Sequence, residues 1–437
     1  MSTPKPFSKG ARAAAVLGIT ALSLTACAGG GDKDAETNAD GVTQLVFHSW
    51  LPTQDQWTEL IAAFEEENED IKITFTREED FDAYITNLDN EILADEVPDI
   101  YGIQVGSAFN DYASYALPAS EYAQDWIGSL NVAALEQTTD ASGEVAAVPI
   151  LNGGMQYYLY NKTIMDDLNL TLPENYDELK EVSAQVRAAG YSPFAMGAAD
   201  TWHVADFFVW LSNQYGSGGD IYRAANGEIA WDSPNLVAAA QQWQDLFTDG
   251  VFQDAATTVA TYPNARDDYF LAGKSPFFPT GSWHVGAALA TSPEVPGTAV
   301  EGDEIGMAVF PTLGSNQSGV TSGVDFALAI SNDSSAEKQE AAAKFVKFMA
   351  VGTGQQMWVN TLQGFPVAND ISVELGADES ELAQSSVDLV TKSLQDSTFA
   401  RKLVVEGRDS LETDLGIILQ NIADGADPAK ELATLNK

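Results

Sequence analysis

The stretch QLVFHSW (residues 44–50), continued by QDQWTELIAAFEEEN (54–68) and DIKITFT (70–76), decides the fold. The first and third segments are short and rich in β-branched and aromatic residues, which predicts two strands. The middle segment carries apolar residues at the three- and four-residue spacing of one helix face: Trp57, Leu60, Ile61 and Phe64. A strand, a helix and a second strand in this order predict parallel pairing, and therefore an α/β fold class.

The same alternation continues along the chain. A helical pattern covers 81–94, and PDIYGIQV (98–105) is a third strand candidate. Two further strand candidates, EVAAVPI (144–150) and QYYLYNK (156–162), open a second region of the same kind. Helices are then predicted over several stretches, of which the last begins the largely helical C-terminal section: 175–190, 233–250, 334–350 and from 380 onward.

Two of these helices carry clear end signals. Asn175 and Ser233 stand where an N-cap is expected, because their short polar side chains can accept a hydrogen bond from a free backbone N–H. Gly190 and Gly250 stand where each helix should stop, since glycine adopts the left-handed conformation that commonly ends a helix.

Composition limits the function. The 437 residues carry 64 acidic and 21 basic side chains, for a formal net charge of −43. Nucleic acid is therefore not expected as a partner, because phosphate binding needs basic patches. The acidity favours a neutral or cationic ligand, and a hydrophobic fraction of 45% supplies a sizeable core.

The single cysteine, Cys27, lies beside an N-terminal targeting pattern. Three cationic residues precede an apolar run over 13–24, which is too short for a membrane span. The order Leu24-Thr25-Ala26-Cys27 resembles the lipobox of bacterial lipoproteins, which implies cleavage before Cys27 and a diacylglyceryl group on its sulfur. Residues 1–26 are thus expected to be a lipoprotein signal peptide and 27–41 a flexible linker; an ordinary signal peptide is the alternative.

Motifs for bound cofactors are missing from the sequence. It contains no GxxxxGK[ST] or GxGxxG loop, no GxSxG elbow, no HExxH and no Cys/His array. No cofactor and no catalytic residue are therefore expected.

Several segments, taken in order, resemble the extracellular solute-binding proteins of ABC importers, in the sugar-binding family that includes maltose-binding protein. They are VPDIYGIQVGSAFNDYASYALPAS (97–120), AVPILNGGMQYYLYNKTIMDDLNLTLPENYDEL (147–179), YFLAGKSPFFPTGSWHVG (269–286), IGMAVFPTL (305–313), GVDFALAISNDSSAEKQEAAAKFVKFM (323–349) and GFPVAN (364–369). The resemblance implies a two-lobed, periplasmic-binding-protein-like type II fold with a hinge. It also implies a lipid-anchored monomer on the extracytoplasmic face of the cell membrane, which captures a carbohydrate and delivers it to ABC permease subunits.

The same resemblance suggests domain boundaries. The N-terminal lobe is expected to contain 42–151 and 312–352. The C-terminal lobe is expected to contain 152–311 and 353–437.

Tryptophans supply candidates for sugar contacts, because flat rings suit the apolar C–H faces of a sugar. Trp50, Trp202 and Trp283 each lie where a strand or loop meets the start of a helix, and the resemblance implies that Trp283 stacks on the ligand. His203, next to Trp202, joins this group. Burial in the core is the alternative for each tryptophan. Core packing is expected of the tryptophans on apolar helix faces: Trp57, Trp210, Trp243 and Trp358.

Polar candidates are chosen from loops and strand ends that a cleft would contain, because their side chains can bond sugar hydroxyls. They are Gln54, Asp55, Gln104, Ser107, Asn152, Asp325 and Gln363. Asp55 could instead be a helix N-cap. Asp325 interrupts an apolar strand and needs a partner, so it is either a cleft residue or part of a structural pair.

Other functions stay open at this point. A secreted glycoside hydrolase needs two carboxylates flanking the scissile bond, which 64 acids could provide. The chain could also bind a peptide or a metal: its three histidines, His48, His203 and His284, could hold zinc only if the fold brought them together.

Overall fold

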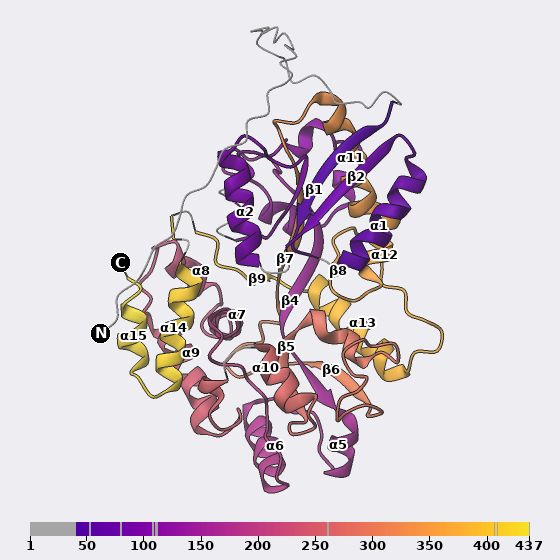
Figure 1. Cartoon of the computed structure of the whole chain (residues 1–437). Coiled ribbons are helices and arrows are strands. Elements are labelled where there is room, and N and C mark those ends of the chain that lie inside the picture. The colour runs from indigo at the N-terminus through magenta and orange to yellow at the C-terminus, as the bar shows by residue number, and fades with distance from the viewer. Residues whose placement is uncertain are drawn as a thin grey trace, which may run out of the picture. The chain divides into compact units, whose positions relative to one another are not determined.

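Parallel strands open the fold, as expected from the first hundred residues. The computed structural model describes residues 41–437 except 52–53, 79–80, 107–108, 110–111, 260–261, 406, 409 and 437. Strand β1 (Thr43–Ser49) pairs in parallel with β2 (Ile71–Arg77) and with β3 (Ile100–Ile103). Helices α1 (Gln54–Glu67) and α2 (Phe81–Leu93) connect these strands, and Figure 1 shows them on opposite sides of the strands.

Two long strands carry the chain from this region into the rest of the molecule. They are β4 (Val148–Asn161) and β7 (Thr321–Ile330), and the first half of β4 pairs with β7 in antiparallel fashion. The second half of β4 pairs instead with β5 (Phe277–Gly281) and β6 (Ile305–Val309). One mixed sheet results, with the order β2-β1-β3-β7-β4-β5. We call β4 and β7 the crossing strands.

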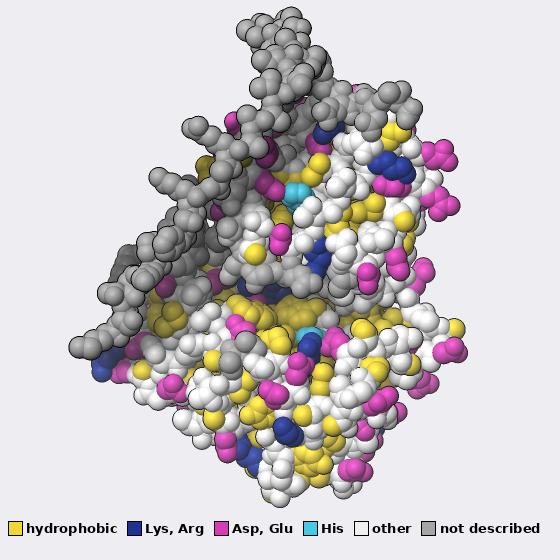
Figure 2. Space-filling model, in the orientation of Figure 1, with side chains coloured by type: hydrophobic (Ala, Val, Ile, Leu, Met, Phe, Trp, Pro, Cys, Tyr) yellow, Lys and Arg dark blue, Asp and Glu magenta, His cyan; other side chains and the backbone are white. Residues whose placement is uncertain are grey.

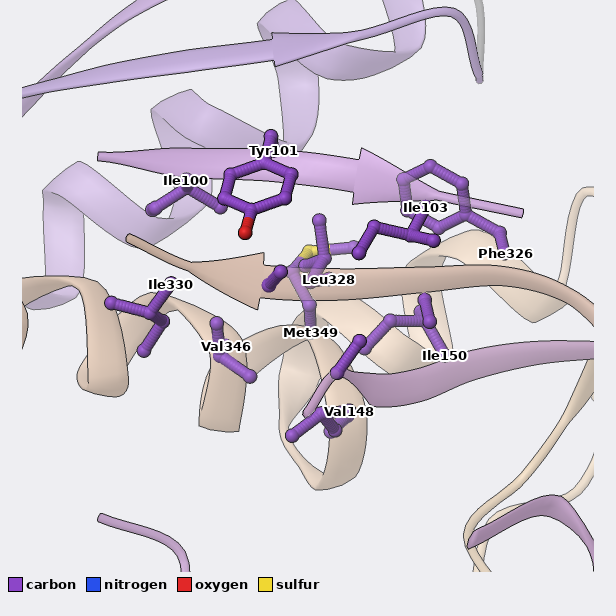
Figure 3. Close-up of a cluster of buried hydrophobic side chains, with 14 of the residues drawn as sticks. Ile100, Tyr101, Ile103, Val148, Ile150, Phe326, Leu328, Ile330, Val346 and Met349 are labelled. Carbon is purple, nitrogen blue, oxygen red and sulfur yellow. The ribbon is translucent and has the colours of Figure 1, made fainter. Parts of the chain in front are cut away.

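The first lobe is the set of elements packed around one buried cluster, part of which is drawn in Figure 3. In this view, side chains of β3 and β7, among them Ile100 and Leu328, lie above Val346 and Met349 of α11 (Ala336–Val351). Trp57 of α1 is fully buried and packs edge-on against Phe47, with ring centroids 4.7 Å apart.

Helix α12 (Thr353–Val359) also belongs to the first lobe. The sequence placed residues 353–437 in the other lobe, but Trp358 of α12 packs against Trp57 at 5.4 Å and against Phe326 at 5.1 Å. Trp358 and Val359 of α12 thus share the buried cluster of the first lobe.

The second lobe is built around two further buried clusters and is mainly helical. Its helices are α5 (Lys162–Asp167), α6 (Tyr176–Ala188), α7 (Thr201–Ser212), α8 (Asp220–Ala225), α9 (Pro234–Thr248), α10 (Tyr262–Ala265), α13 (Glu381–Gln395), α14 (Leu411–Ala423) and α15 (Pro428–Ala433). The remaining short elements of the sheet and of the first lobe are α4 (Val132–Gln137), β8 (Phe365–Pro366) and β9 (Phe399–Ala400). Short 3₁₀ helices include Ser282–Ala288, which directly follows β5.

Both predicted N-caps begin their helices. Asn175 accepts a hydrogen bond from the N–H of Glu178, and Gly190 ends the helix with φ +90°. Ser233 precedes α9, but its hydroxyl makes no capping bond. Among the described residues, no helix is both long enough and apolar enough to cross a lipid bilayer.

Candidate functional site

Three aromatic rings from separate segments meet where the second lobe adjoins the crossing strands; we call them the aromatic cluster. Trp202 lies in the first turn of α7, Tyr262 opens α10, and Trp283 follows β5. The ring centroid of Trp202 lies 5.1 Å from that of Tyr262 and 6.2 Å from that of Trp283. Tyr262 is 5% exposed, whereas the two indoles are only half-buried.

The backbone of β5 fixes the ring of Trp283. A Cβ on Gly281 would lie 2.2 Å from two ring carbons of Trp283, so the indole rests on the bare Cα of this glycine. The indole N–H donates to the hydroxyl of Tyr262 at 3.1 Å. The polar edge of Trp283 is therefore satisfied within the protein, and the ring can offer only its apolar surface to a ligand.

Tyr262 is a buried anchor for this arrangement. Burial raises the pKa of the Tyr262 phenol above its usual range, so the group is neutral at physiological pH. Its oxygen contacts both the Trp283 N–H and the hydroxyl of Thr280. Because these partners belong to β5 and to the turn that follows it, Tyr262 connects α10 to the segment that presents Trp283.

Asp325 and Arg401 supply charge beside the aromatic cluster. Asp325 lies on the crossing strand β7, and its Oδ1 is 2.5 Å from Nη2 of Arg401. The guanidinium carbon of Arg401 lies 5.3 Å from the ring centroid of Trp283. A Cβ on Gly153 of β4 would lie 1.8 Å from Oδ2 of Asp325, so only glycine leaves room for the carboxylate here.

A second ion pair ties α7 to the same segment. Asp206 of α7 is 1% exposed and lies 3.0 Å from Nζ of Lys402 and 3.5 Å from Nε of Arg401. Burial opposes the charge on Arg401, but the carboxylates of Asp325 and Asp206 outweigh it and raise its pKa. Arg401 and Lys402 therefore stay charged at physiological pH, because the nearby carboxylates stabilise their cationic forms.

His203 lies behind the aromatic cluster. It is fully buried, and its ring centroid is 4.6 Å from that of Tyr262. Burial lowers the pKa of His203 to about 4, against a smaller opposing effect of Asp206, so the imidazole is neutral at pH 7. Since its side chain has no exposed surface here, His203 supports Trp202 and Tyr262 from inside.

The other predicted tryptophan is not part of this cluster. Trp50 is 6% exposed and packs in the first lobe, with ring centroids 5.2 Å from both Tyr84 and Phe326. The four tryptophans assigned to the core are all at most 1% exposed, which confirms that prediction: Trp57, Trp210, Trp243 and Trp358.

The predicted polar residues are scattered by comparison. Gln54 and Asp55 are exposed in the first turn of α1, and Gln104 is half-buried just after β3. Asn152 lies on β4 opposite Val324 and is half-buried, as is Asp325 on the neighbouring strand. Gln363 is exposed just before β8, and Ser107 and Cys27 lie outside the described residues.

The histidines do not converge. His48 pairs with Glu91 at 3.0 Å, and His284 with Glu294 at 2.8 Å. Within the described part of the chain, no three His, Cys, Asp or Glu side chains are grouped so that they could hold a metal ion.

Hydrophobic side chains gather along a furrow on the face drawn in Figure 2. Two cavities have other linings: one of about 600 Å³ is lined in part by Arg266 and Glu294, and one of about 190 Å³ in part by His48 and Tyr84. Neither is lined by a member of the aromatic cluster.

Tyr262, Arg401, Asp206 and Gly153 were not foreseen from the sequence. Tyr262, Arg401 and Asp206 stand in segments with no motif, and Arg401 follows a two-residue strand that no periodicity reveals. Gly153 lies within the quoted segment 147–179 but was not singled out there. A fully buried acid within a strongly apolar helix, as at Asp206, was the one available signal, because such a group needs a partner.

Comparison with known proteins gives the same picture of the fold. A curated relative, the multiple sugar-binding protein of Streptococcus mutans, is 25% identical over 363 residues, or 81% of each chain. The GacH receptor of Streptomyces glaucescens superimposes with a TM-score of 0.71 at 19% identity, over 90% of this chain and 96% of that one. RafE from Streptococcus pneumoniae gives 0.69 at 19% identity, over 92% and 98%.

These structures confirm the predicted fold class, an α/β, two-lobed type II periplasmic-binding-protein-like fold. The model of the bacterial extracellular solute-binding protein family matches residues 59–382, which is most of the chain. The chain therefore belongs to the bacterial extracellular solute-binding proteins, a family of the extracytoplasmic space.

Proposed function

We propose that this protein is the sugar receptor of an ABC importer and that the aromatic cluster is its ligand site. The observation that carries the proposal is the pair of half-buried indoles, Trp202 and Trp283, fixed beside the partly exposed carboxylate of Asp325. Rigid rings match the C–H faces of a sugar, and a carboxylate accepts hydrogen bonds from its hydroxyls.

The relatives support a carbohydrate as the ligand class. The relative in Streptococcus mutans is named a multiple sugar-binding protein. Structurally similar proteins have been solved with raffinose and with maltose bound. We extend from these proteins to the present chain only the class, a mono- or oligosaccharide, and not the individual sugar.

Capture requires no bond chemistry in this proposal. The crossing strands β4 and β7 act as a hinge, and closure of the lobes buries the ligand on both faces. The closed form then docks on the permease subunits and releases the sugar to them. Five predicted ligand residues outside the aromatic cluster, each half-buried or exposed, complete the site from the first lobe and the hinge in this proposal: Gln54, Asp55, Gln104, Asn152 and Gln363.

A thermal-shift screen tests the ligand class. The purified protein is heated with neutral mono- and oligosaccharides, with peptides, and with divalent metal ions. A sugar that binds only the folded state stabilises it by about 2.7 kcal/mol at one hundred times its Kd, which raises the Tm by several degrees. No shift with any sugar contradicts the proposal. Shifts with peptides or metals alone identify a different solute, and turnover of an oligosaccharide identifies a hydrolase.

We further propose that Cys27 carries a diacylglyceryl anchor, as the sequence Leu24-Thr25-Ala26-Cys27 indicates. Two acyl chains give stable membrane attachment, whereas a single chain is marginal. Cys27→Ser should therefore release the protein from the membrane fraction of the producing cells. Membrane association equal to that of the unaltered protein would contradict the anchor without affecting the sugar site.

A further inference from the structure

Five charged side chains form one network beside Trp283, which we call the charge network. Its members are Asp206, Asp325, Arg401, Lys402 and Glu412. Three carboxylates and two cations leave it with a net charge of −1. Moving charges out of water is costly, and buried ion pairs are weak evidence for stability, so a network in this position calls for another role.

The backbone fixes the cationic members of the network on the hinge. Arg401 follows β9, which pairs in parallel with the start of β7, and the Arg401 N–H donates to the carbonyl of Ser322 at 2.9 Å. Asp206, by contrast, belongs to α7, one turn after Trp202. The charge network therefore connects a crossing strand with the helix that presents one of the two indoles.

Exposure rises along the contacts that lead from Asp206 through Arg401 to Asp325. The side chain of Asp206 is 1% exposed, that of Arg401 6% and that of Asp325 18%. Oδ2 of Asp325 rests against Gly153 and accepts no hydrogen bond from any residue that the structure describes. The carboxylate therefore keeps one acceptor for a group that approaches from outside.

Arg401 lies between these partners and holds them in one arrangement. Its guanidinium contacts Asp325 on one side and Asp206 on another, with the ring of Trp283 beside it. In this part of the described chain, the buried Nε and Nη1 of Arg401 have no hydrogen-bond partner. Because a guanidinium is planar and rigid, fixing it fixes the positions of both the Asp325 oxygens and the indole relative to it.

We propose that Arg401 is the positioning residue of the sugar site, and that the site it builds accepts neutral or cationic sugars and rejects sugar acids. The inference rests on the proposed function. Arg401 acts through Asp325, which accepts hydrogen bonds from ligand hydroxyls, and through Trp283, which packs on the ligand's apolar face. A sugar carboxylate in the same place would face the Asp325 side chain within a network that holds three acidic and two basic residues.

Binding measurements with matched probes test this inference. Titration calorimetry compares maltotriose, xylotriose and raffinose with trigalacturonic acid on the purified protein. The unaltered protein should bind at least one neutral probe, with no measurable heat from trigalacturonic acid. Arg401→Lys keeps the charge but loses the planar guanidinium, and it should weaken that neutral probe at least tenfold.

Asp325→Asn distinguishes a role in recognition from a purely structural role, because it should change the affinities for neutral and acidic sugars in opposite directions. The variant should bind the neutral probe at least tenfold more weakly and bind trigalacturonic acid more tightly than the unaltered protein does. If Arg401→Lys does not fold, Asp325→Asn carries the test, because it removes the charge that faces the ligand.

Arg187→Lys is the matched control. The Arg187 guanidinium also donates hydrogen bonds, to the carbonyls of Gly250 at 3.0 Å and Phe252 at 2.6 Å, but Arg187 is not a member of the charge network. This change should lower the Tm and leave the affinity unaltered.

The outcomes separate the two proposals. If none of the probes, neutral or acidic, binds the unaltered protein, both the sugar assignment and the role of Arg401 fail. If a neutral probe binds and Arg401→Lys or Asp325→Asn leaves its affinity within twofold, or if trigalacturonic acid binds as tightly as the neutral probe, only the present inference is overturned.

Discussion

Trp283 shows how one side chain is prepared for a ligand before any ligand arrives. Its N–H is bonded to Tyr262, and its ring lies on the Cα of Gly281. Little conformational entropy is then lost on binding, because the rotamer is already set. Such fixed aromatic anchors tend to carry a large share of binding energy.

Trp283→Ala should weaken sugar binding by at least about 2 kcal/mol, or roughly thirtyfold in Kd. Titration calorimetry with the sugar selected in the thermal-shift screen measures the change. Trp126→Ala is the control, because Trp126 is also half-buried but packs on the first-lobe cluster. Equal sugar affinities for the two variants would show that Trp283 has only a structural role.

His203 should make the stability of the protein depend on pH. Its pKa is about 4 in the folded state and near 6.5 in the unfolded chain. Between these values the unfolded state binds more protons, so stability is lost as the pH falls from 6.5 toward 4, by up to about 3 kcal/mol. The folded state lowers the pKa values of Asp140 and Asp427. Their protonation therefore reduces the stability of the protein only at still lower pH.

Urea unfolding of the protein and of His203→Gln at pH 7.0, 5.5 and 4.5 checks this. The variant should lose less stability over that interval, because its side chain does not titrate. Identical pH dependence of the two proteins would contradict the assignment. Other titrating groups are common to both proteins and cancel in the comparison.

At the scale of elements, the crossing strands bring the site together. Gly153 of β4 and Asp325 of β7 are near neighbours in the sheet, and the glycine leaves the space that the carboxylate occupies. Immediately beyond, Gln156 has φ +87° at a shift in the pairing register, where β4 exchanges β7 for β5 and β6 as its partners. The change of partner makes β4 part of both lobes.

Gly153→Ala should weaken sugar binding because the new methyl group displaces the Asp325 carboxylate from Arg401. We expect a loss of at least tenfold in affinity together with a lower Tm. Gly128→Ala is the control, since a Cβ at Gly128 meets no atom within 4 Å. If both alanine variants bind sugar alike, the packing of Asp325 on Gly153 has no part in recognition.

Local signals in the sequence predicted many elements but did not predict β4 as one continuous strand. The helix starts at Asn175 and Ser233 and the stops at Gly190 and Gly250 were predicted because such signals depend on a few neighbouring residues, although only Asn175 makes the expected capping hydrogen bond. The strand candidates 144–150 and 156–162 overlap the two ends of the single strand β4 (Val148–Asn161). Asn152-Gly153-Gly154 looks like a break in the sequence, and only pairing with distant strands makes it extended.

At the scale of the whole molecule, the order of segments predicted the fold class better than it predicted the site. The ordered resemblance pointed to two lobes, and apolar helix faces identified the buried tryptophans. The aromatic cluster and the charge network, however, draw on segments near residues 202, 262, 283, 325 and 401. Their meeting depends on the path of the sheet and on packing between helices, which no local pattern encodes.

Hydrogen–deuterium exchange with and without a saturating sugar tests the central claim most directly, that a sugar is held at the aromatic cluster beside the hinge. Exchange should slow in the segments that form the site, namely 152–156, 201–204, 262–265, 280–285, 322–326 and 399–402. Unchanged exchange in all of these segments, or protection confined to the first-lobe cavity around His48 and Glu91, would contradict the account.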